Sequence, residues 1–204
     1  MGAEGYKKIN LDSGIMRFLA RITDLVILQI LFLLTCLPVV TIGAGLTAMF
    51  AISRKLHQDS VTSVVRTYFE EFKGNLKKGT VVWLILAAVA GLLYVDISYY
   101  IAQESTVILY VSFFLTGMVY FIFLYIFPIM AWFESGLLSY FKNSLIMACM
   151  HLATTMIVTM IYAAVAWLGI LVAPLVYLFG LSGIIYISSF FFERALFGSF
   201  EREE

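Results

Sequence analysis

Charge is scarce in this chain of 204 residues. Lys, Arg, Asp and Glu make up 13% of it, which is about half of their usual share in soluble domains, whereas 62% of the residues are hydrophobic. The formal net charge is zero, so the basic excess that nucleic-acid binding requires is absent. The apolar residues form long runs rather than one-sided stripes. This pattern predicts an integral membrane protein that contacts a lipid bilayer and has no nucleic-acid partner.

Cysteine, histidine and proline are also rare, with two, two and three copies. Cys36 and Cys149 lie in or beside apolar runs, which favours small buried side chains over a disulfide. His57 and His151 are far apart, and neither a His-Glu-x-x-His nor a GxxxxGK[ST] pattern occurs. We therefore expect no metal, no other cofactor and no catalytic residue, and we predict that the chain is not an enzyme.

The stretch from Thr35 to Lys55 is apolar, but Pro38, Gly43 and Gly45 interrupt it. Proline lacks a backbone donor and clashes with the preceding turn, so a helix that arrives there should end or bend. Each resulting piece has about 15 residues, or ~22 Å of helix, against a hydrocarbon core of ~30 Å. We expect residues 22–55 to form a short helical hairpin, either as two short spans or as one span and a re-entrant arm.

Apolar residues repeat at helical spacing after this hairpin, at Val61, Val65, Phe69, Phe72 and Leu76. Charged side chains occupy the other faces, and Arg66 and Glu70 form a favourable i,i+4 pair. We predict an amphipathic interfacial helix within residues 56–78. It could pack on the cytoplasmic face of the protein itself or dock a partner, and the sequence leaves both readings open.

The rest of the chain completes a single integral membrane domain over residues 1–204. The predicted fold class is all-α, a polytopic membrane helix bundle with about six membrane segments, the first two short, plus the cytoplasmic amphipathic helix. Its parts are a cytoplasmic lead-in at 1–21, the hairpin at 22–55, the amphipathic helix at 56–78, four spans at 79–194 with a turn at Pro174, and a cytoplasmic tail at 195–204.

The placement of basic residues supplies an orientation. In this topology the outward loops lie near 38–44, 102–105 and 171–174, and none of them contains Lys or Arg. All thirteen basic residues then fall on the side of the two termini, which we expect to be the cytoplasm. Asp24 sits near the start of the first span, three residues after Arg21 on the same helix face, and we interpret it as a paired or solvated boundary charge.

One short motif, Gly180-Leu181-Ser182-Gly183, looks like the serine motif of rhomboid intramembrane proteases. A nucleophilic serine needs a base within hydrogen-bonding reach, and no histidine follows this one. In the predicted topology His151 lies near the inner edge of the membrane, whereas Ser182 lies ~12 Å below the outer end of its helix, so the two are poorly placed to form a dyad. Glycine and serine also allow close helix packing, which is the interpretation that we favour.

The chain resembles the YesL-like family of bacterial integral membrane proteins, whose function is not established. The segments that carry the resemblance are Leu37–Ala44 with Thr47-Ala48, Arg54–Leu56, Val65-Arg66, Phe69, Phe72-Lys73, Asn75, Trp83, Phe127-Pro128 and Phe141–Leu145. Members of that family typically lie beside genes for carbohydrate ABC importers and glycan-degrading enzymes. The resemblance implies a multi-pass protein of the bacterial cytoplasmic membrane with an accessory role in sugar uptake.

A looser similarity concerns Tyr140–Ile146, Thr154-Thr155 and Ala163-Ala164, which look like the start of the core of carbohydrate-importer permeases. Such permeases also need a Glu-Ala-Ala-type loop that couples them to the ATPase, and this chain has no such loop. We therefore expect a relative or companion of a permease rather than a working one.

These observations lead to a functional expectation, a non-catalytic accessory or regulatory membrane subunit associated with a carbohydrate ABC importer. Permease subunits are the expected partners, and an oligosaccharide is an indirect one. The alternatives are a small independent transporter or channel and, behind it, an intramembrane serine protease. The candidate partner or hairpin positions are Pro38, Gly43, Gly45, Arg66, Phe69, Phe72, Lys73, Phe141 and Lys142.

Overall fold

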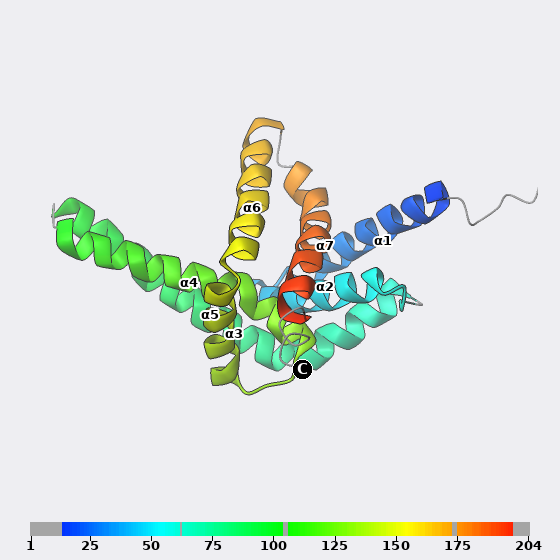
Figure 1. Ribbon diagram of the computed structural model, residues 1–204, viewed down its shortest axis with the longest axis horizontal. Coiled ribbons are helices and arrows are strands. Elements are labelled where there is room, and N and C mark those ends of the chain that lie inside the picture. Colours follow the sequence, from blue (N-terminus) through cyan, green and yellow to red (C-terminus); the bar gives the residue numbers. More distant parts are fainter. Residues whose placement is uncertain (1–13, 62, 104–105, 173–174, 198–204) are drawn as a thin grey trace, which may run out of the picture.

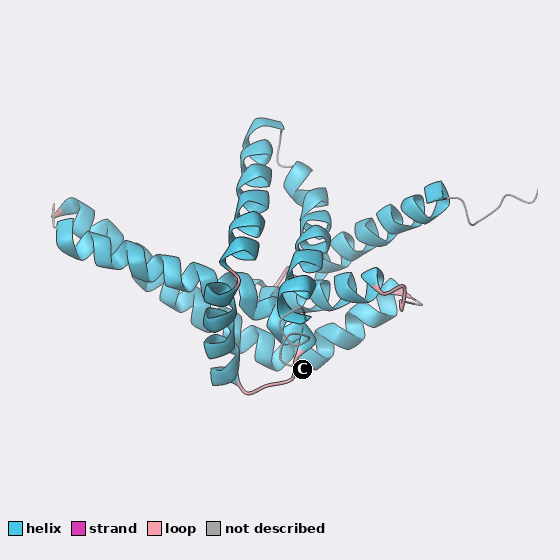
Figure 2. Ribbon diagram, viewed as in Figure 1, coloured by secondary structure: helices cyan, strands magenta, loops and turns pink. Residues whose placement is uncertain are grey.

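A computed structural model describes residues 14–61, 63–103, 106–172 and 175–197. This part of the chain is helical throughout, without a strand (Figure 2). The elements in chain order are α1 (Gly14–Thr35), the short 3-10 helix η1 (Val39–Thr41), α2 (Ile42–His57), α3 (Val64–Ala102), α4 (Thr106–Trp132), α5 (Leu137–Met150), α6 (Leu152–Val172) and α7 (Leu175–Phe197). The predicted lead-in up to residue 13, the turn at Pro174 and the tail from residue 198 lie outside the described residues.

The all-helical membrane architecture predicted from the sequence is confirmed in outline. Four stretches are long and apolar enough to cross a bilayer, namely Phe18–Thr35, Val39–His57, Val64–Ala102 and Val107–Trp132. A fifth is added if α5 and α6, which meet at a bend of 96°, count as one broken span. The predicted count of about six is therefore not confirmed within the described residues.

The expected break at Pro38 is present. Helix α1 ends at Thr35, three residues before the proline, and the chain turns into η1 and α2. The hydroxyl of Thr41 closes this turn because it donates to the carbonyl oxygens of Thr35, at 2.5 Å, and Pro38, at 2.7 Å. These bonds satisfy carbonyl groups that the interrupted helix leaves without intrahelical partners.

Helix α3 is one continuous helix of 39 residues, which covers most of the predicted amphipathic helix and the span that follows it. At 1.5 Å per residue it measures ~58 Å, about twice the hydrocarbon thickness of a bilayer. Its two halves have different neighbours. Residues 64–79, here called the first half, pack on α1 and α2, and residues 80–102, the second half, pack on α4.

The helices leave a common centre in three groups (Figure 1). One group holds α1, α2 and the first half of α3, and another holds the second half of α3 beside α4. The third holds α6 and α7. The buried core lies where the groups meet: most of α2 is buried, as is the stretch 124–130 of α4, together with Tyr68 of α3 and Phe192 of α7.

Two glycines set the distance between α2 and α3. A Cβ atom added at Gly43 would overlap the carbonyl oxygen of Gly79 and lie 2.7 Å from the Cβ of Trp83. A Cβ added at Gly79 would lie 2.8 Å from the Cα of Ala44. The two backbones therefore touch, which only glycine at both positions permits. Gly79 was not singled out by the sequence.

This contact bears on the depth of the hairpin tip, for which the sequence left two short spans and a re-entrant arm open. In the structure Gly43 lies against Gly79, the residue directly after Lys77 and Lys78. The contact favours the re-entrant arm, since Gly79 stands where α3 has only just left its charged segment.

We expect Gly43→Ala and Gly79→Ala each to destabilise the protein by about 1–3 kcal/mol, because the added methyl meets backbone atoms that cannot rotate away. Gly91→Ala is the matched control on α3, since nothing lies within 4 Å of its Cβ position. It should be neutral or stabilising by up to ~1 kcal/mol, as alanine is the better helix former. Thermal unfolding of the purified chain in detergent measures the difference. Equal midpoints for Gly79→Ala and Gly91→Ala would show that the helices do not meet here.

Candidate functional site

Four of the predicted site residues face the interior of the protein. Gly43 and Gly45 are buried in α2, and a Cβ at Gly45 would lie 3.0 Å from the sulfur of Cys36. Phe72 stacks on Tyr68 with ring centroids 6.0 Å apart, and Phe141 packs against the core. The two glycines thus serve helix contacts, and the two half-buried phenylalanines pack against the core.

The other five predicted site residues are exposed. Pro38 lies at the hairpin tip, Arg66, Phe69 and Lys73 lie on the first half of α3, and Lys142 lies on α5. The predicted pair between Arg66 and Glu70 is confirmed, with Nε and Oε1 2.9 Å apart. Both side chains are largely in water, where such a pair adds little stability.

Charges on α3 form a row along the exposed face of its first half. Arg66, Glu70, Lys73 and Lys77 follow one another at intervals of three or four residues, and all are exposed. Phe69, with 40% of its surface exposed, lies beside this row. We call these five residues the charged face of α3. It is the part of the predicted site that the structure leaves accessible.

At the end of the hairpin away from Pro38, two ion pairs join separate elements of the chain. Arg21 of α1 pairs with Asp59 rather than with the neighbouring Asp24, which the sequence had left as either paired or solvated. Asp59 has a positive φ of 52°, in the left-handed region that Asp tolerates better than most residues. Lys55 of α2 binds Glu71 of α3 with Nζ and Oε1 2.7 Å apart.

Neither cysteine forms a disulfide, as the sequence suggested. Cys149 is exposed, and Cys36 is half-buried directly after α1. Burial raises the pKa of the Cys36 thiol to about 11, and a hydrogen bond with Thr35 opposes part of that rise. The thiol is therefore protonated near neutral pH, a state that makes it a poor nucleophile.

Within the serine motif, Ser182 joins α7 to α1 through its backbone, whereas nothing lies within 4 Å of the Cβ position of Gly183. The backbone N–H of Ser182 donates to Oε1 of Gln29 over 2.8 Å, and both residues are buried. The histidine that reaches α7 is His57, whose ring stacks on Tyr186 at 4.1 Å and whose Nε2 lies 2.9 Å from the carbonyl oxygen of Tyr186. Among the residues placed by the structure, no hydrogen bond joins a histidine to Ser182.

Three hydroxyl pairs connect α6 to its neighbours, and the sequence analysis missed them. Tyr125 of α4 bonds Thr155 at 3.0 Å, Tyr120 of α4 bonds Thr159 at 3.1 Å, and Tyr162 of α6 bonds Ser188 of α7 at 3.3 Å. Thr155, Thr159 and Tyr162 are spaced at four and three residues on one face of α6. This spacing is the signal in the sequence that places the three hydroxyl groups on one face, but it does not identify their hydrogen-bond partners on α4 and α7.

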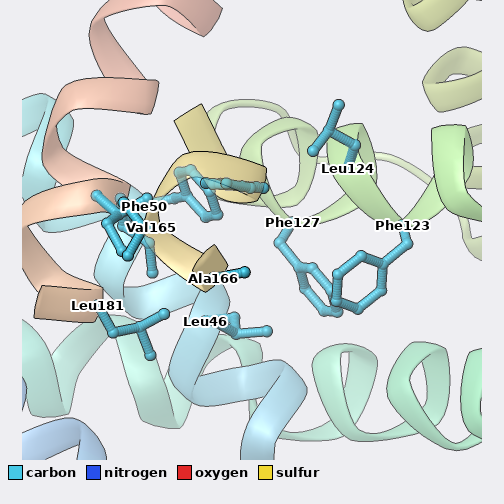
Figure 3. Close-up of a pocket in the computed structure, with 11 residues that line it drawn as sticks. Leu46, Phe50, Phe123, Leu124, Phe127, Val165, Ala166 and Leu181 are labelled. Atoms are coloured by element: carbon cyan, nitrogen blue, oxygen red, sulfur yellow. The ribbon is translucent and has the colours of Figure 1, made fainter. Parts of the chain in front are cut away.

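A cavity of about 260 Å³ lies between α2, α4, α6 and α7. Its walls come from four helices and are apolar, as the close-up in Figure 3 shows for Leu46 and Phe50 of α2, Phe123 and Phe127 of α4, Val165 and Ala166 of α6, and Leu181 of α7. A sugar has a hydroxyl on nearly every carbon, and each would lose its hydrogen bonds to water here without replacement. The cavity therefore suits an apolar occupant.

The fold and the accessible surfaces define a helical protein whose apolar helices are compatible with several passes through a membrane. The chain matches the family described as "Protein of unknown function, DUF624" over residues 25–97. It is 29% identical to the uncharacterized protein YteU of Bacillus subtilis (strain 168) over 166 residues, which are 78% of this chain and 73% of that protein. No solved structure matches the chain.

These similarities support one part of the predicted family resemblance. The chain is similar to a family of unknown function and to an uncharacterized bacterial protein. The matched segment runs from α1 through α2 into the second half of α3, so it contains the Gly43–Gly79 contact. The link to carbohydrate uptake stays a prediction.

We expect the pair Tyr125 and Thr155 to contribute a coupling energy of about 0.6 kcal/mol, and at most ~2 kcal/mol, as such pairs do in other membrane proteins. A double-mutant cycle with Tyr125→Phe and Thr155→Val, read from unfolding in detergent, measures it. Tyr110→Phe, on an exposed part of α4, combined with Thr155→Val is the control and should give no coupling. Additive effects of the first pair would disprove the bond.

Proposed function

We propose that the chain is a non-catalytic accessory subunit that associates with a carbohydrate ABC importer in the membrane. The observation that carries this proposal is the charged face of α3, which remains exposed after α1 and α2 have packed against the rest of the helix. Phe69 and Arg66 on this face are residue types that are enriched at protein interfaces. The importer is the class of partner that the family resemblance implies.

Two further observations favour a subunit over an independent sugar transporter. The cavity between α2, α4, α6 and α7 offers apolar walls, whereas a sugar pathway needs polar groups at mid-membrane depth. Gly43 and Gly45, which could have served as a functional break in a transport path, are used for contacts with α3 and with the end of α1.

The intramembrane protease is the weaker alternative because its nucleophile lacks a base. Nε2 of His57, the ring nitrogen nearest to α7, is engaged by the carbonyl oxygen of Tyr186. Ser182 lies one helical turn before Tyr186 and contributes its backbone to Gln29. A serine protease requires the opposite arrangement, with the hydroxyl bonded to the base.

Photo-crosslinking in native membranes tests the proposed association. With p-benzoylphenylalanine at Phe69, we expect a covalent adduct with a subunit of a carbohydrate importer, identified by mass spectrometry. The matched position is Phe114 on α4, which is 69% exposed on a part of the helix without charges and should react mainly with lipid. Adducts with importer subunits from Phe69 and not from Phe114 support a specific contact.

The same preparation can overturn the proposal. If neither position yields an importer subunit, and vesicles that contain this chain alone transport a solute, the chain is an independent transporter.

To check the enzyme alternative, Ser182→Ala should leave the phenotype of the producing cells unchanged.

A further inference from the structure

We propose that α1, η1, α2 and the first half of α3 form an in-plane unit that inserts into one leaflet of the bilayer and does not cross it. The chemistry that this unit binds is the hydrocarbon of that leaflet on one side and the lipid headgroups with water on the other. The inference concerns the interaction with lipid and holds whether or not an importer is the partner.

The first step is to locate the membrane boundary on α3. This helix is too long to lie wholly in hydrocarbon, and its charges decide which half is outside. Residues 64–79 contain Arg66, Glu70, Glu71, Lys73, Lys77 and Lys78, whereas residues 80–102 contain a single charge, Asp96. Lysines at the bilayer centre are costly, so Lys77 and Lys78 belong at the interface. The hydrocarbon boundary therefore lies near Gly79.

The second step follows from the path of α2, which runs back along the aqueous half of α3. Its beginning touches α3 at Gly79 through Gly43, and its end is tied to Glu71 through Lys55. The beginning of α2 thus lies at the boundary, beside Gly79 and Trp83, and its end lies on the lysine side of it. If α2 crossed the bilayer, its beginning would lie at the opposite boundary.

The third step concerns the outer surface of α1, which is apolar. Side chains on one face of this helix are exposed from its second turn to its end: Phe18, Ile22, Val26, Ile30, Leu33 and Leu34. They recur every three or four residues, as in helices that lie in a membrane interface. The charged face of α3 belongs to the same unit, so the unit offers one surface to lipid tails and another to headgroups.

The fourth step shows that α1 lies within the leaflet and not on top of it. Gln29, near the middle of α1, binds the backbone of Ser182 in α7. Ser182 precedes the charged end of α7 at Glu193 by eleven residues, or ~16 Å of helix. A hydrocarbon core of ~30 Å contains two leaflets, so the middle of α1 lies about one leaflet below the charged end of α7 when α7 crosses the bilayer.

Figure 1 shows that α1 and α2 leave the centre together, in a direction different from that of α6 and α7 and from that of the pair formed by α4 and the second half of α3.

Depth measurements on α1 test the proposal directly. In the full chain with Cys36→Ser and Cys149→Ser, a bimane fluorophore is placed on Ile22→Cys or Leu33→Cys, which are both exposed. Quenching by lipids with a nitroxide at several acyl positions reports its depth in vesicles of phosphatidylglycerol and phosphatidylethanolamine. An in-plane helix places both positions at the same depth within about 5 Å, whereas a crossing helix separates them by ~16 Å along its axis.

A matched pair on α3 calibrates this measurement. Leu92→Cys and Ile101→Cys are exposed on a half of α3 that crosses the membrane, so their depths should differ by up to ~13 Å. Depths that differ as much on α1 as on α3 would overturn the in-plane unit. All four substitutions lie on exposed positions, so loss of folding is not expected to hide the result.

Labelling from the two sides of the membrane gives a second, independent readout. An impermeant maleimide should reach Val40→Cys, at the exposed hairpin tip, from the same side as Gly74→Cys. Gln103→Cys, at the end of α3, should label from the opposite side. If Val40→Cys labels together with Gln103→Cys, the hairpin crosses the bilayer and the proposal is wrong.

Discussion

The contact between Gly43 and Gly79 is the constraint on which the arrangement of the first hundred residues depends. Because neither residue has a side chain, the backbones of α2 and α3 meet directly. That contact fixes how far α2 extends along α3, and the pair of Lys55 with Glu71 then fits at the other end. It also decides that the hairpin accompanies the charged half of α3 rather than the apolar half.

Hydrogen bonds from a few hydroxyl and amide groups join α4 to α6, α6 to α7 and α1 to α7. Between helices in lipid, apolar packing distinguishes poorly among registers because lipid tails are as apolar as leucine. The bonds from Tyr120 and Tyr125 to α6 and from Gln29 to α7 select one register each. The cavity at the same centre remains apolar, so these groups act in helix assembly and leave no polar path beside them.

Composition and local pattern could predict the helical membrane class, the break at Pro38 and the pair of Arg66 with Glu70, since each depends on residues close in sequence. They could not predict the contact at Gly79, because a glycine between a lysine pair and an apolar run has no local signature. Likewise, Arg21 had acceptors at Asp24 and Asp59, and only the fold brings Asp59 to it. Phe69 and Phe72 look alike in the pattern, yet one is exposed and the other stacks on Tyr68.

The in-plane unit and the charged face of α3 are two consequences of one arrangement. A helix that ended at the membrane surface would leave a flexible segment in water, whereas here α1 and α2 hold residues 64–79 at Tyr68, Glu71 and Gly79. Anchoring of α1 in the leaflet then fixes the height and direction of the charged face relative to the lipid headgroups. A surface held in this way loses less conformational entropy when a partner binds. This preorganisation gives α1 and α2 a role: they hold residues 64–79 in one position for a partner.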